Sequence, residues 1–319
     1  MPPPSHVQAR APAKINLTLR VVGRRADGYH DLVSWVAPID LCDELTVERA
    51  NTPALALTCD DPNLPTDGRN LVVRAAESLR RAATSPRDGS KKGETPPGFG
   101  ALITLKKRIP IGAGLGGGSS DAAAALRGLS RVWGLDWPTE RLMDVGATLG
   151  SDVPLFVTGR QCVIRGVGER VTIIERPWRG WVALVVPPFG VSTAAVYAAH
   201  SDAGGITGGT VMPPVEGASD EPARLAALPA REFRRLLYND LEAAARRVEP
   251  RVEALHDRLD GLGGVPVRMT GSGGGLFAVF DDQGEAEGWA RTAAERAGGA
   301  VQVVVCCTWH RESETAEGE

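Results

Sequence analysis

A run of glycines at residues 110–120 limits what this chain can fold into more than any other part of its sequence. The run reads Pro-Ile-Gly-Ala-Gly-Leu-Gly-Gly-Gly-Ser-Ser. It lies between residues 102–105, an apolar segment that predicts a strand, and the alanine-rich residues 119–132, which predict a helix. Glycine lets the backbone turn its N–H groups inward without a Cβ in the way, and a helix N-terminus adds partial positive charge. The run therefore predicts a concave anion-binding loop, which suits phosphate.

Two familiar phosphate-binding loops do not fit this run. Gly112, Gly114 and Gly117 satisfy the spacing of a dinucleotide-binding motif, but that motif also needs a second strand ending in an acid about 20 residues on. Residues 134–138 occupy that place and read Gly-Leu-Asp-Trp-Pro, which is typical of a turn. A Walker A loop ends in Gly-Lys-Ser/Thr, whereas Gly118 precedes a serine. We therefore favour a phosphate loop of another kind over a purely structural connection.

Length and the mixture of patterns set the outer limits on the fold. The 319 residues are too many for one small core, so the sequence predicts two domains, at residues 1–160 and 161–319. Both contain strand and helix patterns, which predicts an α+β fold in two lobes. The polar, Gly- and Pro-rich residues 84–100 and 202–222 predict loops, and the tail from residue 311 is polar. Strands are expected at residues 13–22, 32–39, 44–48, 171–174, 181–186 and 301–307, and helices at 70–83, 139–149, 232–247 and 251–259.

Charge and hydropathy exclude several classes of partner. The net charge of -3 provides no broad basic surface for nucleic acid. No apolar stretch approaches the roughly 18 residues that a membrane span needs, and the first residues lack the apolar core of a signal peptide. Five cysteines without a Cys-x-x-Cys pair argue against a zinc site. We expect a cytoplasmic protein with no nucleic-acid or membrane partner.

Three polar clusters outside the glycine run are candidates for chemistry. Lys14 and Asn16 are two residues apart in an expected strand, so both point to one face, and apolar neighbours favour partial burial of the lysine. Residues 27–30 read Asp-Gly-Tyr-His, which is typical of a hairpin turn, although both rings could instead stack on a base. Asp152 follows an expected helix end, where a carboxylate either caps the next turn or takes part in chemistry.

A second glycine-rich segment, residues 269–277, reads Met-Thr-Gly-Ser-Gly-Gly-Gly-Leu-Phe and leads into an expected strand. It lacks the helix start of the first run. Such a turn indicates a close backbone approach, either to a ligand or to the first glycine run, or else a bulged hairpin.

Taken in this order, the segments resemble the three motifs of the GHMP kinase superfamily, which match residues 11–17, 110–124 and 270–280. The narrower family of kinases that phosphorylate 4-diphosphocytidyl-2-C-methyl-D-erythritol is similar also at residues 23–30, 116–123 and 149–154, the last reading Leu-Gly-Ser-Asp-Val-Pro. The resemblance implies a two-lobed α+β fold. It also implies transfer of phosphate from ATP, with Mg²⁺, to the 2-hydroxyl of that small molecule, by a monomer or homodimer.

The same resemblance implies roles for individual residues. Asp152 matches the family's proposed base, and Lys14 matches the cation beside it. The cytidine pocket and substrate contacts match Asn16, Tyr29, His30 and Tyr197, whereas the magnesium ligands are left unassigned. The residues expected at ATP are Asn70, Lys107, Pro110, Ile111, Gly112, Ala113, Gly114, Leu115, Gly116, Gly117, Gly118, Ser119 and Ser120.

Two other functions stay open on the sequence alone. Another GHMP kinase acting on a different alcohol would share the glycine run but would not need Tyr29 and His30. A non-catalytic nucleotide-binding relative would need neither Lys14 nor Asp152. Residues 84–100 and 202–222 are long for the family and hold none of its motifs.

Overall fold

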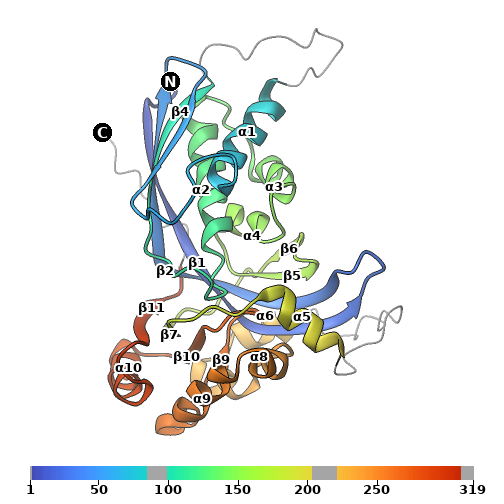
Figure 1. The fold of residues 1–319 in the computed structure, drawn as a ribbon, viewed down its shortest axis with the longest axis vertical. Coiled ribbons are helices and arrows are strands. Elements are labelled where there is room, and N and C mark those ends of the chain that lie inside the picture. Colours follow the sequence, from blue (N-terminus) through green and yellow to red (C-terminus); the bar gives the residue numbers. More distant parts are fainter. Residues whose placement is uncertain (1, 85–98, 203–220, 310–319) are drawn as a thin grey trace.

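The computed structural model describes residues 2–84, 99–202 and 221–309. It contains two β-sheets with helices packed against each (Figure 1). The mixed content confirms the α+β class that the sequence predicts. Within the described residues, no helix is long and apolar enough to cross a membrane.

The first sheet is built on a long antiparallel hairpin. Its strands β1 and β2 pair from His6↔Glu48 to Arg24↔His30, around a turn in which Gly28 has φ +88°. The hairpin that Asp-Gly predicts is thereby confirmed, whereas the two separate strands expected at 32–39 and 44–48 are one strand. The strand order is β3-β4-β2-β1-β8, and β5 pairs with β2 and β6. The bounds are β1 His6–Arg24, β2 His30–Ala50, β3 Leu55–Cys59, β4 Gly100–Lys106, β5 Cys162–Gly166, β6 Arg170–Ile173 and β8 Tyr238–Asn239.

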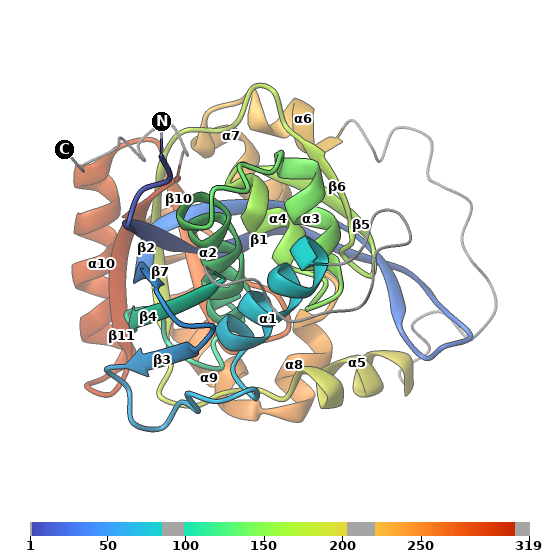
Figure 2. The ribbon, with the colours of Figure 1, turned by 90° about the horizontal axis from the view of Figure 1, so that it is seen from above.

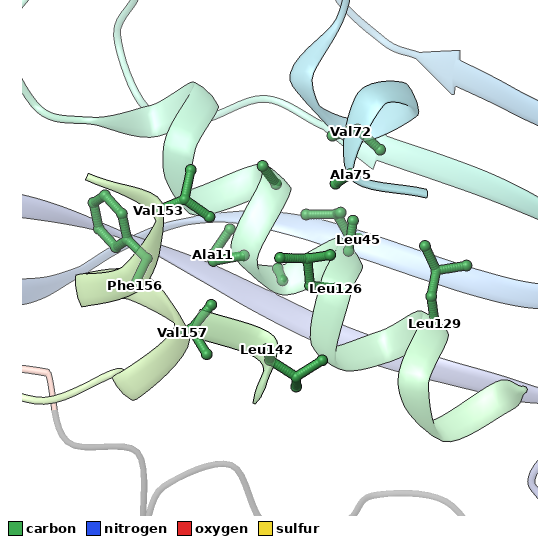
Figure 3. Close-up of a cluster of buried hydrophobic side chains, with 14 of the residues drawn as sticks. Ala11, Leu45, Val72, Ala75, Leu126, Leu129, Leu142, Val153, Phe156 and Val157 are labelled. Atoms are coloured by element: carbon green, nitrogen blue, oxygen red, sulfur yellow. The ribbon is translucent and has the colours of Figure 1, made fainter. Parts of the chain in front are cut away.

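Four helices cover one face of this sheet (Figures 1 and 2). They are α1 Leu71–Thr84, α2 Gly117–Val132, α3 Thr139–Ala147 and α4 Val153–Thr158. Figure 3 shows Val72, Leu126 and Phe156, from three of these helices, in one buried cluster with Leu45 of the sheet. The alanines of α2 are small enough for that helix to lie between the sheet and the other helices, and most of its residues are buried.

The second sheet has the antiparallel order β11-β7-β10-β9. Its strands are β7 Trp181–Val186, β9 Arg268–Met269, β10 Leu276–Phe280 and β11 Gln302–Cys307. The helices that follow β6 are α5 Thr193–Asp202, α6 Glu221–Ala226, α7 Ala230–Phe233, α8 Glu242–Val248, α9 Pro250–Leu259 and α10 Gln283–Ala297. One buried apolar cluster joins the sheets, since it includes Ile15 of β1, Leu184 of β7 and Phe277 of β10.

Some of the expected elements are wrong. The single helix expected at 232–247 is a short helix, a 3₁₀ turn at Arg234–Leu236, strand β8 and helix α8. The break occurs because β8 pairs in parallel with β1, and Asn239 Nδ2 donates to Met269 O and Gly271 O at 2.9 and 2.8 Å. These long-range partners satisfy polar groups that a continuous helix would have placed elsewhere.

Other boundaries shift by smaller amounts. Helix α2 begins at Gly117, two residues before the expected start, and residues 221–222 belong to α6 and not to a loop. Residues 85–98, 203–220 and the tail from 310 lie outside the described part of the chain. The division near residue 160 stays a prediction, and β5, β6 and β8, which follow it in sequence, pair into the first sheet.

Candidate active site

Two glycine-rich segments meet backbone to backbone at the junction of the sheets. We call residues 110–120 the first glycine loop and residues 271–275 the second glycine turn. A Cβ on Gly114, which has φ +79°, would lie 2.8 Å from Thr270 O, and one on Gly273 would lie 2.5 Å from Gly114 N. The second glycine turn therefore approaches the first loop, which is one of the alternatives that the sequence left open.

A cavity of about 270 Å³ lies beside the first glycine loop. It is lined by Leu64, Pro65, Arg69, Asn70, Leu71, Lys107, Ile109, Pro110, Ile111, Gly112, Gly114, Leu115, Gly116, Gly117, Gly118 and Asp121. Asn70 also caps α1, because its Oδ1 accepts from Val72 N at 2.9 Å. Three residues of the expected ATP set, Ala113, Ser119 and Ser120, do not line the cavity, and Ala113 is instead buried.

The loop geometry fits an anionic ligand. Gly116 has φ +73°, and a Cβ there would lie 2.8 Å from Phe156 Cζ, so only glycine fits. Helix α2 then starts at Gly117, and its first N–H groups have no acceptor within the helix. Ser120 Oγ is buried and has no hydrogen-bond partner among the described residues. Free donors and a buried hydroxyl at one helix start suit phosphate oxygens.

Lys107, Asp43 and Asp121 form a buried ionic cluster beside this loop. Lys107 Nζ donates to Asp43 and to Asp121 Oδ2, the latter at 2.7 Å. Asp43 Oδ1 also accepts from Arg108 N and Ile109 N, at 2.5 and 2.8 Å, which fixes the chain just before the loop. Burial opposes the charge on Lys107, but the two carboxylates raise its pKa overall. Burial also raises the pKa of Asp121 to about 7; Lys107 opposes this rise and Asp43 adds to it.

This cluster makes stability depend on pH. An ordinary Asp releases its proton near pH 4, whereas folded Asp121 keeps it until about pH 7, so the folded state binds more protons in between. Its contribution to the free energy of unfolding therefore falls as pH rises through that window. We expect the melting temperature of Asp121→Asn, relative to wild type, to increase by at least about 2 °C between pH 5 and pH 8. Parallel melting curves for the two proteins across that range would contradict this.

Lys14 is buried where β1 passes the first glycine loop. Its backbone N donates to Leu115 O at 3.0 Å, and its Nζ donates to Asn16 Oδ1 at 2.6 Å. Burial lowers the pKa of Lys14, and the charge of Asp152 acts in the opposite direction. Lys14 is only 6% exposed, so the burial that its apolar neighbours predict is confirmed.

Asp152 directly precedes α4 and is half-buried. Its side chain makes no capping hydrogen bond to α4, so helix capping does not account for it. Burial, and after it the charge of Asp152, raises the pKa of Tyr197 to about 12. The carboxylate therefore lies near both Lys14 and Tyr197.

The hairpin turn and α5 bring two rings together. His30 and Tyr197 stack with centroids 5.0 Å apart and planes at 30°. His30 Nε2 is also 2.8 Å from Ser201 Oγ, and burial, then Arg24 and His200, lowers the pKa of the imidazole. Tyr29, at the hairpin tip, is 66% exposed.

The expected site residues thus fall into two connected groups. Lys14, Asn16, Asp152, Tyr197 and His30 are linked through neighbouring contacts and charges. Ten of the thirteen residues expected at ATP line the cavity beside the first glycine loop.

Sequence reasoning missed the residues that support both groups. Asp121 directly follows the serines of the loop motif, which is a usable signal. Thr270 opens the third motif, but no local signal marks Asp43, because its partner Lys107 lies far away in the sequence. Within the described residues, no group of three or more His, Cys, Asp or Glu side chains could hold a metal ion.

The chain is similar to known proteins over most of its length. Models of the GHMP kinase N-terminal and C-terminal domains match residues 70–160 and 225–297. A 4-diphosphocytidyl-2-C-methyl-D-erythritol kinase of Geobacter sp. (strain M21) is 37% identical over 290 residues, which is 90% of this chain and 93% of that protein.

Solved structures are similar over nearly the whole chain as well. A crystal structure of 4-(cytidine 5'-diphospho)-2C-methyl-D-erythritol kinase has a TM-score of 0.68 and 36% identity, covering 95% of this chain and 99% of that one. A homoserine kinase from Cytophaga hutchinsonii shares the fold at 18% identity and a TM-score of 0.67, with 96% of each chain covered.

Proposed function

Because the chain belongs to the 4-diphosphocytidyl-2-C-methyl-D-erythritol kinase family of GHMP kinases, we propose that it transfers phosphate from ATP to the 2-hydroxyl of that substrate. The reaction belongs to the non-mevalonate pathway to isoprenoid precursors. The single observation that carries the assignment of the site is the position of Lys14. Its backbone contacts the first glycine loop, and its ammonium lies within the field of Asp152.

Asp152 is the residue that would take the alcohol proton. The 2-hydroxyl is tertiary and hindered, so the rate depends on alignment and on control of charge. A carboxylate can accept the proton as the new bond to phosphorus forms. The Lys14 ammonium offsets the negative charge that develops on the reacting oxygens.

The first glycine loop would hold the phosphates of ATP. Its glycine backbone and the free N–H groups at the start of α2 supply donors, and Ser119 and Ser120 supply hydroxyls. Asn70 and Lys107 line the wall of the cavity where the nucleoside would lie. A magnesium ion, which these two hydroxyls would help to hold, supplies positive charge at the phosphates when bound.

The substrate end of the site would bind the cytosine base. The His30–Tyr197 stack provides aromatic faces, and the neutral imidazole that its lowered pKa favours can both donate and accept a hydrogen bond. Tyr29 stands exposed on the same hairpin and would close over the base. A kinase for a small alcohol such as homoserine has no use for this aromatic pair.

An ADP-release assay with a panel of alcohols tests the function. We expect ADP only when magnesium, ATP and the cytidine-linked substrate are all present. Homoserine and mevalonate serve as controls, because kinases for these alcohols share the fold. Equal turnover of homoserine would refute the cytidine assignment, and no turnover of any alcohol would favour a non-catalytic nucleotide-binding protein.

A further inference from the structure

We infer that Ser34 is a positioning residue, which holds the carboxamide of Asn16 in the one orientation that presents its oxygen to Lys14. The inference rests on the proposed function, in which Lys14 is the cation beside the base. Ser34 lies on β2, is fully buried, and is marked by no motif of the sequence.

The direction of the hydrogen bonds follows from the atoms involved. Ser34 Oγ lies 2.5 Å from Thr18 O, a carbonyl oxygen that can only accept, so the serine hydroxyl donates its single proton there. The hydroxyl is left as an acceptor toward Asn16, whose Nδ2 donates to it at 2.8 Å. With Nδ2 turned to Ser34, the Oδ1 of Asn16 faces Lys14 Nζ at 2.6 Å.

The backbone around Asn16 is fixed independently of this chain of hydrogen bonds. Asn16 N donates to Thr270 Oγ1 at 3.0 Å, which ties β1 to the residue before the second glycine turn. The β1–β2 register shifts between Asn16 and Thr18, and such bulges re-aim side chains. What remains free is rotation of the carboxamide itself, and the Ser34 hydroxyl is the side-chain group bonded to its nitrogen.

The orientation matters because Lys14 is buried. Burial lowers the pKa of its ammonium, and a hydrogen bond to Asn16 Oδ1 favours the charged form. Without the Ser34 hydroxyl, Nδ2 would be left unpaired in a buried place, at 4% exposure of Asn16. The carboxamide would then rotate to find another partner and withdraw Oδ1 from the ammonium. Lys14 would then lose its proton at a lower pH than in wild type, and its ammonium would lose the hydrogen bond that fixes its position.

Ser34→Ala tests this role directly. We expect kcat to fall about tenfold, of the order of one hydrogen bond, with little change in the KM for ATP. The alkaline limb of the kcat–pH profile moves to lower pH, because Lys14 loses its proton more easily. Ser130→Ala is the matched control, because Ser130 is another buried serine, 2% exposed, that belongs to neither group of site residues. Its Oγ accepts a hydrogen bond from Trp137 N, with 3.2 Å between the two atoms. Its kcat and pH profile should equal those of wild type.

A double-mutant cycle with Asn16→Asp separates positioning from general damage. A carboxylate has two equivalent oxygens and no N–H, so its orientation toward Lys14 does not depend on Ser34. In the Asn16→Asp background, Ser34→Ala should change kcat by less than about twofold. An equal tenfold loss in both backgrounds, or a wild-type pH profile in Ser34→Ala, would overturn the inference.

The charge state of Lys14 can also be read without turnover. Titration of the lysine Cε resonances by NMR should show a lower pKa for Lys14 in Ser34→Ala than in wild type, and an unchanged value would overturn the inference. This measurement stands even if wild-type protein fails to phosphorylate the cytidine substrate, a result that would reject the proposed function alone.

Discussion

Asp152→Asn is expected to lower kcat by about 10²–10⁴-fold, because the amide cannot accept the proton of the substrate hydroxyl. The replacement is nearly isosteric, and the carboxylate makes no capping hydrogen bond to α4, so the fold should persist. Asp152 is half-buried and its charge acts on Lys14, so we attribute the expected loss of kcat to the chemical step and not to unfolding. Single-turnover measurement of ADP release, with the protein saturated in both substrates, gives the rate.

The affinity for ATP separates this loss from a general defect. Asp152→Asn should bind a non-hydrolysable ATP analogue as wild type does, because Asp152 does not line the nucleotide cavity. Asp144→Asn is the matched control, since Asp144 is exposed on the neighbouring helix α3. Full turnover by Asp152→Asn would remove Asp152 from the role of base.

Gly273→Ala is expected to reduce kcat/KM by about 10²-fold through a purely steric effect. A Cβ at Gly273 would lie 2.5 Å from Gly114 N and 2.6 Å from the Ala113 carbonyl carbon, and neither backbone atom can rotate away. The first glycine loop would have to shift, and displacements of about 1 Å in a phosphate-binding loop cost rates of this size. Because the added methyl group has no room between the two backbone segments, it should also lower the free energy of unfolding by about 2 kcal/mol.

Kinetics and melting curves together check this prediction. Gly299→Ala is the control, since a Cβ there would meet nothing within 4 Å. Both its melting temperature and its kcat/KM should stay close to wild type. Unchanged affinity for the ATP analogue in Gly273→Ala would show that the contact between the two glycine segments does not shape the nucleotide site.

Local chemistry accounts for the parts of the fold that could be read from the sequence. The Asp-Gly turn predicts the β1–β2 hairpin because glycine readily adopts the positive φ found at Gly28. The alanine-rich segment predicts α2, but the predicted start is two residues late, because glycine has a low helix propensity and α2 begins with Gly117 and Gly118. The prediction of a helix at 232–247 was wrong, because the pairing of β8 with β1 overrode the local helix propensity.

The candidate site divides in the same way. Lys14 and Asn16 share a strand face, and their side chains do form a hydrogen bond. His30 and Tyr197 are 167 positions apart, however, and only the packing of α5 beside the hairpin stacks their rings. No spacing rule reaches across such a distance.

By itself, the sequence determined the kinase family to which the chain belongs, and it predicts an anion-binding loop at residues 110–120, because motif residues carry both signals locally. Only the tertiary structure decided which residues contact and support that loop and the residues around Lys14. Three sets of contacts join segments that are separated in the sequence. They are the backbone contact with the second glycine turn, the Asp43–Lys107–Asp121 cluster and the hydrogen bonds that link Ser34 to Asn16 and Lys14. Hydrogen bonds and steric exclusion act over a few ångströms of space, so they exist only once the two sheets have packed together.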